Sequence, residues 1–485
     1  MNYGIIKRTL GFLLIFEAIF FAVPAIVAIV CQEREIFDFL LAMLVSVAVG
    51  GILLIGKPKR NTLYAKEGIV IVAASWLLMS LIGALPFVFS GAIPSYIDAL
   101  FETASGFTTT GATILSGEQI EALPQSLLMW RSFTHWLGGM GVLVFIMAFL
   151  PLCAGGNNIN ILRAESPGPS VGKLVPKMRS TAGILYLIYT GLTVLEFIFL
   201  VFGEMTVLEA LNTAFATAGT GGFGVRADSL GGYSSYTQIV VTVFMVLFSI
   251  NFTSYFFILR GKFKDAFNTE VCVFLGIVAT AIALISLNLC LAESAAYDYT
   301  TGEAVKHSAF SVAAVISTTG FTTVDFNLWP TFSKTILVLL MFVGACAGST
   351  GGGMKVSRML ILFKGATHEM KRMLHPKQIK KITLDKRIVD HEVVRGVNSY
   401  LIAFFGVYIL SMLLVGLEGY DIVTTFTSVA ATINNIGPGL NLVGPSGNFA
   451  FFNDFSKIVF IFDMLAGRLE IFPMLLLFAP STWRK

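Results

Sequence analysis

Charged side chains are scarce in this sequence. Asp, Glu, Lys and Arg together make up 13% of the 485 residues, about half the share typical of soluble proteins, whereas 55% of the residues are hydrophobic. A chain with so little charge cannot cover its surface with polar side chains, and we therefore expect it to cross a membrane several times. The net charge of +4 says less than the position of the charges does.

Residues that carry out chemistry are also few. The five histidines form no His-Glu-x-x-His pair, which excludes the commonest zinc-protease pattern. The five cysteines lie in or beside apolar segments without the spacing of a metal site, and we interpret them as inert thiols. They are Cys31, Cys153, Cys272, Cys290 and Cys346. We therefore expect neither an enzyme nor a covalently bound cofactor.

Four short stretches, about a hundred residues apart, resemble one another. Each combines glycine with Thr or Asn, follows a short run of small and apolar residues, and precedes a long apolar segment. The four are Thr108–Thr113, Gly219–Gly224, Ser317–Thr322 and Asn434–Gly439. A repeat of this period has to be recognised before the fold can be predicted, because it indicates one structural unit used four times.

When the stretches are aligned on one glycine, a short polar residue stands two positions before it in each. This pattern resembles a degenerate potassium-channel filter, in which backbone carbonyls replace the water shell of the ion. Glycine permits the backbone conformations that turn consecutive carbonyls toward one axis. The predicted filter residues are Thr109, Thr110, Gly111, Thr220, Gly221, Gly222, Thr318, Thr319, Gly320, Asn435, Ile436 and Gly437. The alternative is that these small residues only pack helices together.

The predicted fold is an all-α polytopic membrane protein, with an N-terminal hairpin and four helix/re-entrant loop/helix repeats around a pseudo-fourfold central pore. The hairpin helices are expected at about Leu10–Val30 and Phe37–Ile55. The entering helices are expected at Gly68–Phe89, Thr181–Val201, Val271–Leu291 and Tyr400–Leu417. The short re-entrant helices are expected at Ser95–Thr108, Val207–Ala218, His307–Ile316 and Asp421–Ile433. The exit helices are expected at Ser126–Leu150, Ile239–Leu259, Thr335–Phe363 and Ile458–Phe478. Apart from the interrupted third exit helix, the outer spans approach the 20 residues that cross about 30 Å of hydrocarbon.

These helices divide the chain into six units. The predicted bounds are 1–60 for the hairpin, 61–155, 156–265 and 266–363 for the first three repeats, 364–395 for a basic cytoplasmic linker, and 396–485 for the fourth repeat. Ten crossings place both termini on one side of the membrane. Lys and Arg gather in the connections on that side, so we expect both termini in the cytoplasm and the four loops toward the outer face.

The sequence resembles the TrkH/TrkG branch of the Trk/Ktr/HKT cation transporter superfamily. The four loops, the repeats, the N-terminal helix pair and the stretch Ala347–Lys355 carry this resemblance over nearly the whole chain. It implies potassium uptake across the bacterial inner membrane, with rubidium as an analogue, by a homodimer with one pore per protomer. It also implies a cytoplasmic nucleotide-binding subunit of the TrkA type. Within the superfamily a serine at the first filter glycine accompanies sodium permeation, so Gly111 favours potassium.

Glycine is concentrated at one point of the third exit helix. Five of the ten residues in Gly344–Gly353 are glycine, and each costs a helix about 1 kcal/mol relative to alanine. We therefore expect an intramembrane loop below the filter that acts as a gate. The predicted gate residues are Gly348, Ser349, Thr350, Gly351, Gly352, Gly353, Lys355 and Arg468. Met354 separates Gly353 from Lys355, which argues against a phosphate-binding loop, and close helix packing stays open as an alternative.

Arg468 stands about ten residues inside the last predicted crossing, near the middle of the bilayer. A guanidinium at that depth costs at least about 2.5–3.5 kcal/mol on insertion scales, so it should face protein or water. We interpret it as an electrostatic barrier to cations in the cavity below the filter. The alternative is a structural salt bridge to Glu470 or Asp463.

Three further questions stay open at the level of sequence. Glu102 either adds negative field behind the filter or only forms hydrogen bonds. The basic stretch 364–395 is either charge retained in the cytoplasm or a docking site for a regulatory partner or anionic membrane lipids, and no nucleic-acid motif accompanies it. A sodium-coupled solute symporter is the alternative function, although its site would use two discontinuous crossings rather than four re-entrant loops.

Overall fold

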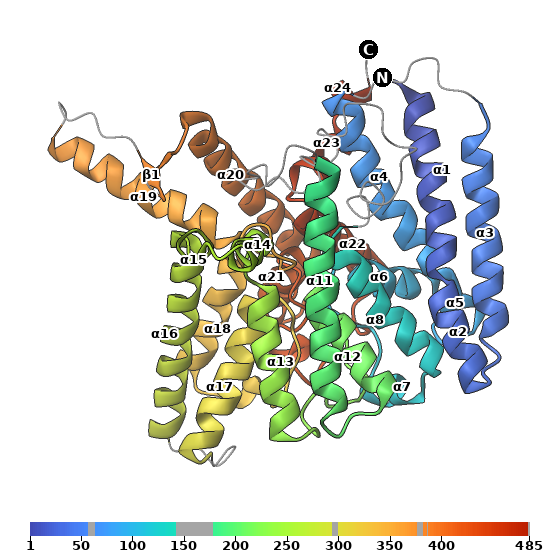
Figure 1. The fold of residues 1–485 in the computed structure, drawn as a ribbon, viewed down its shortest axis with the longest axis horizontal. Helices are drawn as coiled ribbons and strands as arrows, with labels where there is room; N and C mark the ends of the chain where they lie inside the picture. The colour runs from blue at the N-terminus through green and yellow to red at the C-terminus, as the bar shows by residue number, and fades with distance from the viewer. Residues whose placement is uncertain (57–63, 142–177, 293–298, 376–381, 386, 484–485) are drawn as a thin grey trace.

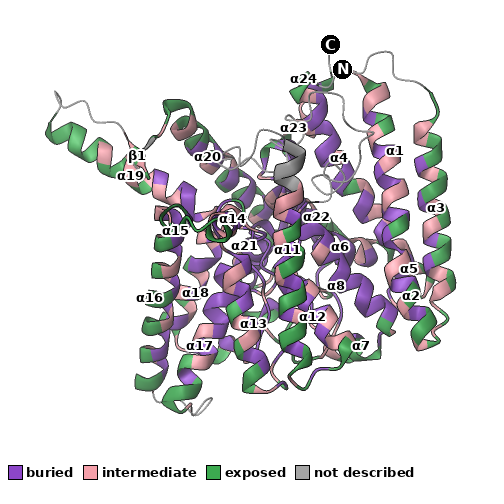
Figure 2. Cartoon of the chain, viewed as in Figure 1, coloured by how far each residue is buried: buried purple, intermediate pink, exposed green. Residues whose placement is uncertain are grey.

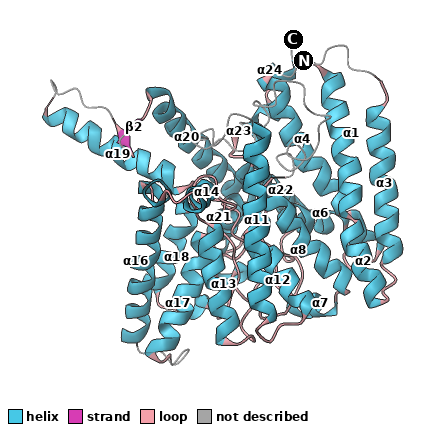
Figure 3. Cartoon of the chain, in the orientation of Figure 1, coloured by secondary structure: helices cyan, strands magenta, loops and turns pink. Residues whose placement is uncertain are grey.

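The structure is a computed structural model that describes residues 1–56, 64–141, 178–292, 299–375, 382–385 and 387–483. The described chain is helical apart from connecting loops and one small β-hairpin, as Figures 1 and 3 show. Six helices are long and apolar enough to cross a membrane within these residues, and a seventh crossing results if one bent pair is counted as a span. The prediction of an all-α polytopic fold is confirmed.

The N-terminal hairpin consists of α1 (Tyr3–Phe20) and α2 (Ala22–Cys31), which together form one span, and α3 (Ile36–Leu54). Two glycines let its backbones approach closely, because a Cβ added to Gly11 would lie 2.8 Å from the carbonyl oxygen of Gly50. Small residues thus let the helices of the hairpin pack closely. Close packing matters here because the hydrophobic effect does not drive helices together in lipid.

Each repeat enters through a long helix, as expected. The entering helices are α4 (Ala65–Gly83) with its short continuation α5 (Leu85–Phe89), α11 (Met178–Val201), α16 (Thr269–Leu291) and α20 (His391–Val415). All start two to nine residues before their predicted bounds, because their polar first turns carry no apolar signal. Figure 2 shows that α3 and α16 carry many exposed residues, whereas the buried residues gather around the central elements.

The four re-entrant helices are short and largely buried. They are α6 (Tyr96–Phe107), α12 (Val207–Gly219), α17 (Thr301–Ile316) and α21 (Ile422–Ile433). Each begins with a side chain that caps the backbone N–H three residues later, from Ser95, Thr206, Thr300 and Asp421. Hydrogen bonds from the hydroxyl and the N–H of Thr424 hold the pKa of the Asp421 carboxyl below its ordinary value. The third helix starts six residues before its predicted bound because of its capping box with Glu303.

The exit helices differ most from expectation. They are α8 (Gln125–Gly139), α13 (Ser235–Phe248), α18 (Thr331–Val343) and α22 (Asp454–Arg468), each of 13 to 15 residues. The chain continues into α14 (Phe252–Leu259) at an angle of 93° to α13, into α19 (Val356–Leu374), and into α23 (Phe472–Phe478). The prediction of one continuous exit helix is therefore wrong for the second and fourth repeats. The predicted end of the first exit helix, and the boundary between residues 155 and 156, lie outside the described residues.

The remaining elements are short and connect or follow the longer helices. The short helices are α7 (Gly117–Ala122), α15 (Phe263–Ala266), α24 (Pro480–Trp483) and the 3-10 turns η2 (Phe326–Leu328), η3 (Gly416–Glu418) and η4 (Asn441–Val443). The strands β1 (Thr383–Leu384) and β2 (Arg387–Ile388) pair antiparallel between α19 and α20. Helix α19 extends eleven residues beyond the predicted end of the third repeat, so it forms the first part of the basic stretch 364–395.

The two termini lie at the same end of the molecule (Figure 1). The hydroxyl of Tyr3 donates to the carbonyl of Trp483 at 3.4 Å, and Lys66 Nζ donates to the carbonyl of Ser481 at 2.9 Å. An even number of passages through the molecule is required for this arrangement.

Candidate ion pathway

The four predicted filter loops have the same backbone conformation. One glycine of each loop is here called the ring glycine, namely Gly111, Gly222, Gly320 and Gly437. The residue two positions before each ring glycine adopts a left-handed conformation with φ between 55° and 60°, although it is not glycine. These residues are Thr109, Thr220, Thr318 and Asn435. The ring glycines themselves have φ between 76° and 97°. Repetition of an uncommon conformation at four equivalent positions shows that the loops are one structural unit used four times.

Each re-entrant helix also ends with the same hydrogen bond. The N–H of the residue before the ring glycine donates to a helix carbonyl five residues earlier, at 2.8–2.9 Å. The donor and acceptor pairs are Thr110 with Ser105, Gly221 with Ala216, Thr319 with Ala314, and Ile436 with Ala431. This is the Schellman termination, and it turns the chain sharply away from the helix axis. The four helices thus direct their negative C-terminal ends at one region, which favours a cation there.

The four loops close into a ring. Each ring glycine lies against the carbonyl oxygen of the residue that precedes the glycine of another loop, in the pairs Gly111 with Gly221, Gly222 with Thr319, Gly320 with Ile436, and Gly437 with Thr110. The order runs from the first repeat to the second, third and fourth, and back to the first. In the first three pairs an added Cβ would overlap the oxygen, whereas a Cβ on Gly437 would lie 2.8 Å from the oxygen of Thr110.

The fourth loop is built differently, as its sequence indicates. Asn435 Nδ2 donates to Thr110 Oγ1 at 2.9 Å and to the carbonyl of Met464 at 2.9 Å. The amide therefore ties the fourth loop both to the first loop and to the exit helix α22, which a threonine is too short to do. Gly437 has the largest φ of the ring glycines, 97°, and precedes Pro438.

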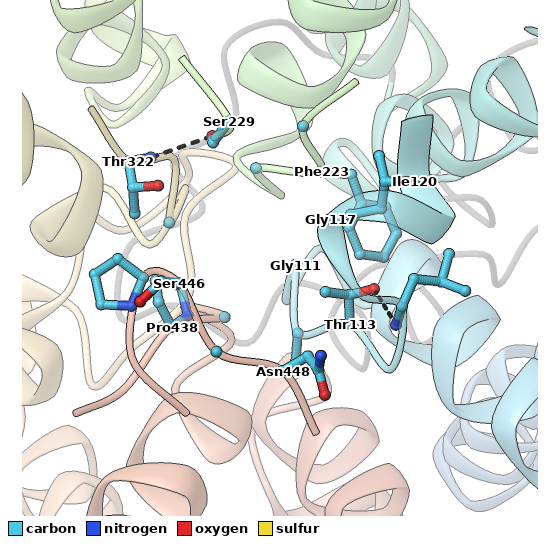
Figure 4. Close-up of a pocket in the computed structure, with 18 of the residues that line it drawn as sticks. Gly111, Thr113, Gly117, Ile120, Phe223, Ser229, Thr322, Pro438, Ser446 and Asn448 are labelled. Atoms are coloured by element: carbon cyan, nitrogen blue, oxygen red, sulfur yellow. Dashed lines mark hydrogen bonds between the residues drawn. The ribbon is translucent and has the colours of Figure 1, made fainter. Parts of the chain in front are cut away.

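A pocket opens on the far side of the ring glycines from the re-entrant helix ends. Residues from all four repeats line it, among them Gly111, Phe223, Thr322 and Pro438. Figure 4 shows these residues around a common space, together with Asn448 from the segment after the fourth loop. Gly117 and Ile120 of α7 also line the pocket, and α7 lies at the end of the molecule opposite the termini (Figure 1).

A buried ion pair ties the first two loops together. Arg131 on α8 donates to Glu102 on α6 at 2.9 Å, and its guanidinium also reaches the carbonyl of Gly224 at 3.3 Å and lies 4.2 Å from the ring centroid of Phe223. Glu102 accepts further hydrogen bonds from the hydroxyl of Thr113 at 3.0 Å. Glu102, whose role the sequence left open, thus lies in a buried ion pair that holds the loops.

His135 packs in the same region. Its imidazole stacks on Phe223, with 4.2 Å between the ring centroids. The imidazole also lies against Gly221, because a Cβ added to that glycine would overlap it. The histidine therefore supports the second loop, and among the described residues no group of three metal-ligating side chains is found.

The predicted glycine-rich loop is present. Between α18 and α19 the chain is not helical, and its tip lies directly against the ring. The N–H of Gly352 donates to Thr318 Oγ1 at 2.6 Å, and the N–H of Gly353 donates to the carbonyl of Asn434 at 3.1 Å. The loop thus contacts the third and fourth filter loops at the side facing the re-entrant helix ends.

The same loop also reaches the second repeat. Thr350 Oγ1 donates to the carbonyl of Phe248 at 3.1 Å, and the carbonyl of Gly348 accepts from the N–H of Phe252 at 3.0 Å. Ser349 donates to the carbonyl of Cys346 at 2.6 Å within the loop, and Lys355 Nζ donates to the carbonyl of Gly351. Contacts with several repeats place the loop across the region beneath the ring.

Arg468 joins this loop to the first repeat. Its guanidinium donates to the carbonyl of Thr350 at 2.8 Å, to that of Gly139 at 2.8 Å, and to that of Gly138. Glu470 pairs with Arg358, and Asp463 accepts from the hydroxyl of Ser411 at 2.7 Å. The contacts of Arg468 thus include carbonyls from two other repeats, which the spacing of residues along α22 could not indicate.

Comparison with known proteins bears on this geometry. Residues 35–485 match the model of the TrkH family, described as a cation transport protein. The chain is 36% identical to the Trk system potassium uptake protein TrkH of Salmonella typhimurium over 100% of both chains, and 31% identical to the Trk system potassium uptake protein TrkG of Escherichia coli over 99% of this chain and 98% of that one.

A solved structure is similar over the same extent. The crystal structure of the potassium transporter TrkH from Vibrio parahaemolyticus matches with a TM-score of 0.89 and 32% sequence identity, covering 100% of each chain. The similarity includes the complete arrangement of repeats and is not confined to one of them.

Proposed function

Because this chain belongs to the TrkH family of cation transport proteins, we propose that it takes up potassium ions across the bacterial inner membrane through the ring of four filter loops. The family is one of transporters and not of enzymes. Its relatives are named potassium uptake proteins, which supports potassium as the ion.

The closed ring is the observation that carries this proposal. Four helix ends converge with their negative poles toward one region, and each loop rests against a carbonyl oxygen of another. Carbonyl oxygens at such a ring replace the water shell of a dehydrated cation. All four loops have glycine at the ring position, including Gly111, which within the superfamily favours potassium over sodium.

The distribution of Lys and Arg indicates which end of the molecule faces the cytoplasm. The termini and the described part of the basic stretch 364–395 belong to the end of the molecule that we assign to the cytoplasm. The pocket beyond the ring glycines is then the outer entrance.

The glycine-rich loop and Arg468 form the proposed gate. The loop lies between the ring and the cytoplasmic end, where Gly352 contacts Thr318 directly. The guanidinium of Arg468 holds the loop at Thr350 and brings a positive charge beneath the ring, which opposes the passage of a cation. Displacement of the loop would open the path for the cation and would move the loop away from the guanidinium of Arg468.

The proposed assembly is a homodimer with one pore per protomer and a cytoplasmic nucleotide-binding subunit of the TrkA type. The exposed basic residues of α19, such as Lys371 and Arg372, support docking of such a subunit or of anionic membrane lipids on the cytoplasmic side. A sodium-coupled symporter is disfavoured, because its site would lie between two discontinuous crossings rather than in a ring of four loops.

The experiment is ion uptake into proteoliposomes. Radiolabelled rubidium should enter, sodium should enter less, and a panel of organic solutes should not. Serine at Gly111, Gly222 or Gly320 should raise sodium permeability relative to potassium, since a side chain there meets the carbonyl oxygen of another loop. Gly51→Ser is the matched control, because nothing lies within 4 Å of its added Cβ. Unchanged relative permeability in all three ring variants would remove the filter assignment.

A further inference from the structure

One carboxylate holds both ends of the gate loop, which is the glycine-rich loop between α18 and α19. Glu270 Oε1 accepts the backbone N–H of Ala347 at 2.7 Å and that of Ser357 at 3.1 Å. These two residues flank the proposed gate residues, whereas Glu270 belongs to the first turn of α16. We propose that Glu270 is the positioning residue that keeps the gate loop beneath the ring, an inference that rests on the proposed function of that loop.

The base of the loop is also closed by its own backbone. The N–H of Val356 donates to the carbonyl of Ala345 at 3.1 Å, and a Cβ added to Gly353 would lie 2.6 Å from the Cα of Gly344. These contacts fix the shape of the base, as in a compact Ω-loop. They do not attach it to a neighbouring entering helix, and Glu270 supplies that attachment.

The two hydrogen bonds to Glu270 form a strong attachment. Glu270 is 5% exposed, and hydrogen bonds to an ionised acceptor are roughly twice as strong as neutral ones. Loss of the carboxylate would leave the N–H groups of Ala347 and Ser357 without this acceptor in a buried place. The base of the loop would then be held less firmly, and the tip with it.

The first turn of α16 also meets the cytoplasmic β-hairpin. Asp385, between β1 and β2, accepts the N–H of Thr269 at 2.8 Å and its hydroxyl at 2.5 Å. The hairpin and the gate loop are therefore held by adjacent residues, Thr269 and Glu270. A movement of the cytoplasmic stretch can reach the base of the gate through this one turn.

The test compares variants of the full-length protein in proteoliposomes without a cytoplasmic subunit. Glu270→Ala should raise rubidium uptake about tenfold, the effect of about 1.4 kcal/mol on the closed state. Glu270→Gln should stay within twofold of the parent, since its amide oxygen can accept both hydrogen bonds. Glu17→Ala is the matched control, because Glu17 is a fully buried carboxyl on α1 whose oxygens accept no hydrogen bond from the described residues. Its rubidium uptake per folded protein should not change.

A second comparison separates this inference from the gate itself. Deletion of Gly351–Gly353 should raise uptake, and adding Glu270→Ala to the deletion should raise it no further if Glu270 acts through the loop. No effect of the deletion in folded protein would refute the proposed gate. A raised uptake in the deletion, with unchanged uptake in Glu270→Ala at the parent's melting temperature, would refute the role of Glu270 alone.

Should Glu270→Ala fail to fold, Glu270→Asp decides the question. Its carboxylate keeps the charge but is one methylene too short to hold both N–H groups. Uptake above that of the parent supports the positioning role, and uptake equal to that of the parent overturns it.

Discussion

Replacement of Arg468 by alanine should increase cation flux. The guanidinium lies 2.8 Å from the carbonyl oxygens of Thr350 and Gly139, which places its charge beneath the ring. For a cation that passes about 8 Å from this charge, Coulomb's law with an effective dielectric constant of about 20 gives a barrier of about 2 kcal/mol. Removal of such a barrier corresponds to roughly thirtyfold faster passage.

The lost hydrogen bonds act in the same direction. Hydrogen bonds to a charged group contribute about 1.5–3 kcal/mol each, so the loop is held less firmly in Arg468→Ala. Arg468→Lys keeps the charge, but a compact ammonium cannot reproduce the planar fork that holds Thr350 and Gly139 together. We expect its flux to remain closer to that of the parent, because the Coulomb barrier is retained.

The assay is rubidium uptake per folded protein, with the melting temperature in detergent measured for each variant. Arg8→Ala, an exposed arginine on α1, controls for the loss of a positive charge elsewhere. Loss of thermal stability in Arg468→Ala without any gain in flux would refute the barrier and favour a purely structural role.

Three other predictions concern the glycine-rich loop, the Arg131–Glu102 pair and the N-terminal cap of α12. Deletion of Gly351–Gly353 should weaken control by a cytoplasmic subunit as well as raise rubidium flux; a fall in flux with normal folding would show that the loop only packs. Arg131→Gln should lower stability by about 3–5 kcal/mol, since Glu102 is left buried without its cation, and a parental melting temperature would contradict this. Thr206→Ala should lower the free energy of unfolding by about 1 kcal/mol, because the N–H of Glu209 loses the hydroxyl that caps it. Thermal denaturation measures this loss, and rubidium flux per folded protein should stay unchanged.

Local signals in the sequence were sufficient to locate the four loops of the proposed filter. Short polar caps start the re-entrant helices, and a glycine follows three or four residues after the end of each one. Both signals act within a few residues, so they can be read without knowledge of the fold. The interruption of the third exit helix was predictable for the same reason, because glycine lowers helix stability wherever it occurs.

The breaks in the second and fourth exit helices carried no comparable signal. Ser249, Ile250 and Asn251 are not strong helix breakers, and the bend arises where Cys346 donates its N–H to the carbonyl of Ser249. In the fourth repeat Glu470 and Ile471 adopt positive φ values of 57° and 68°, uncommon for these residue types. Such conformations persist because contacts made by distant segments hold them.

The membrane class, the four repeats and the ring glycines can be predicted from the amino-acid sequence, because hydrophobic length, capping and glycine act locally. Which groups contact one another depends on how the helices pack. The pairing of Arg131 with Glu102, the contacts of Arg468 with Thr350 and Gly139, and the hydrogen bond of Ala347 to Glu270 join residues from 29 to 329 positions apart. Long-range partners are selected by packing of whole helices, and no spacing along one helix encodes them.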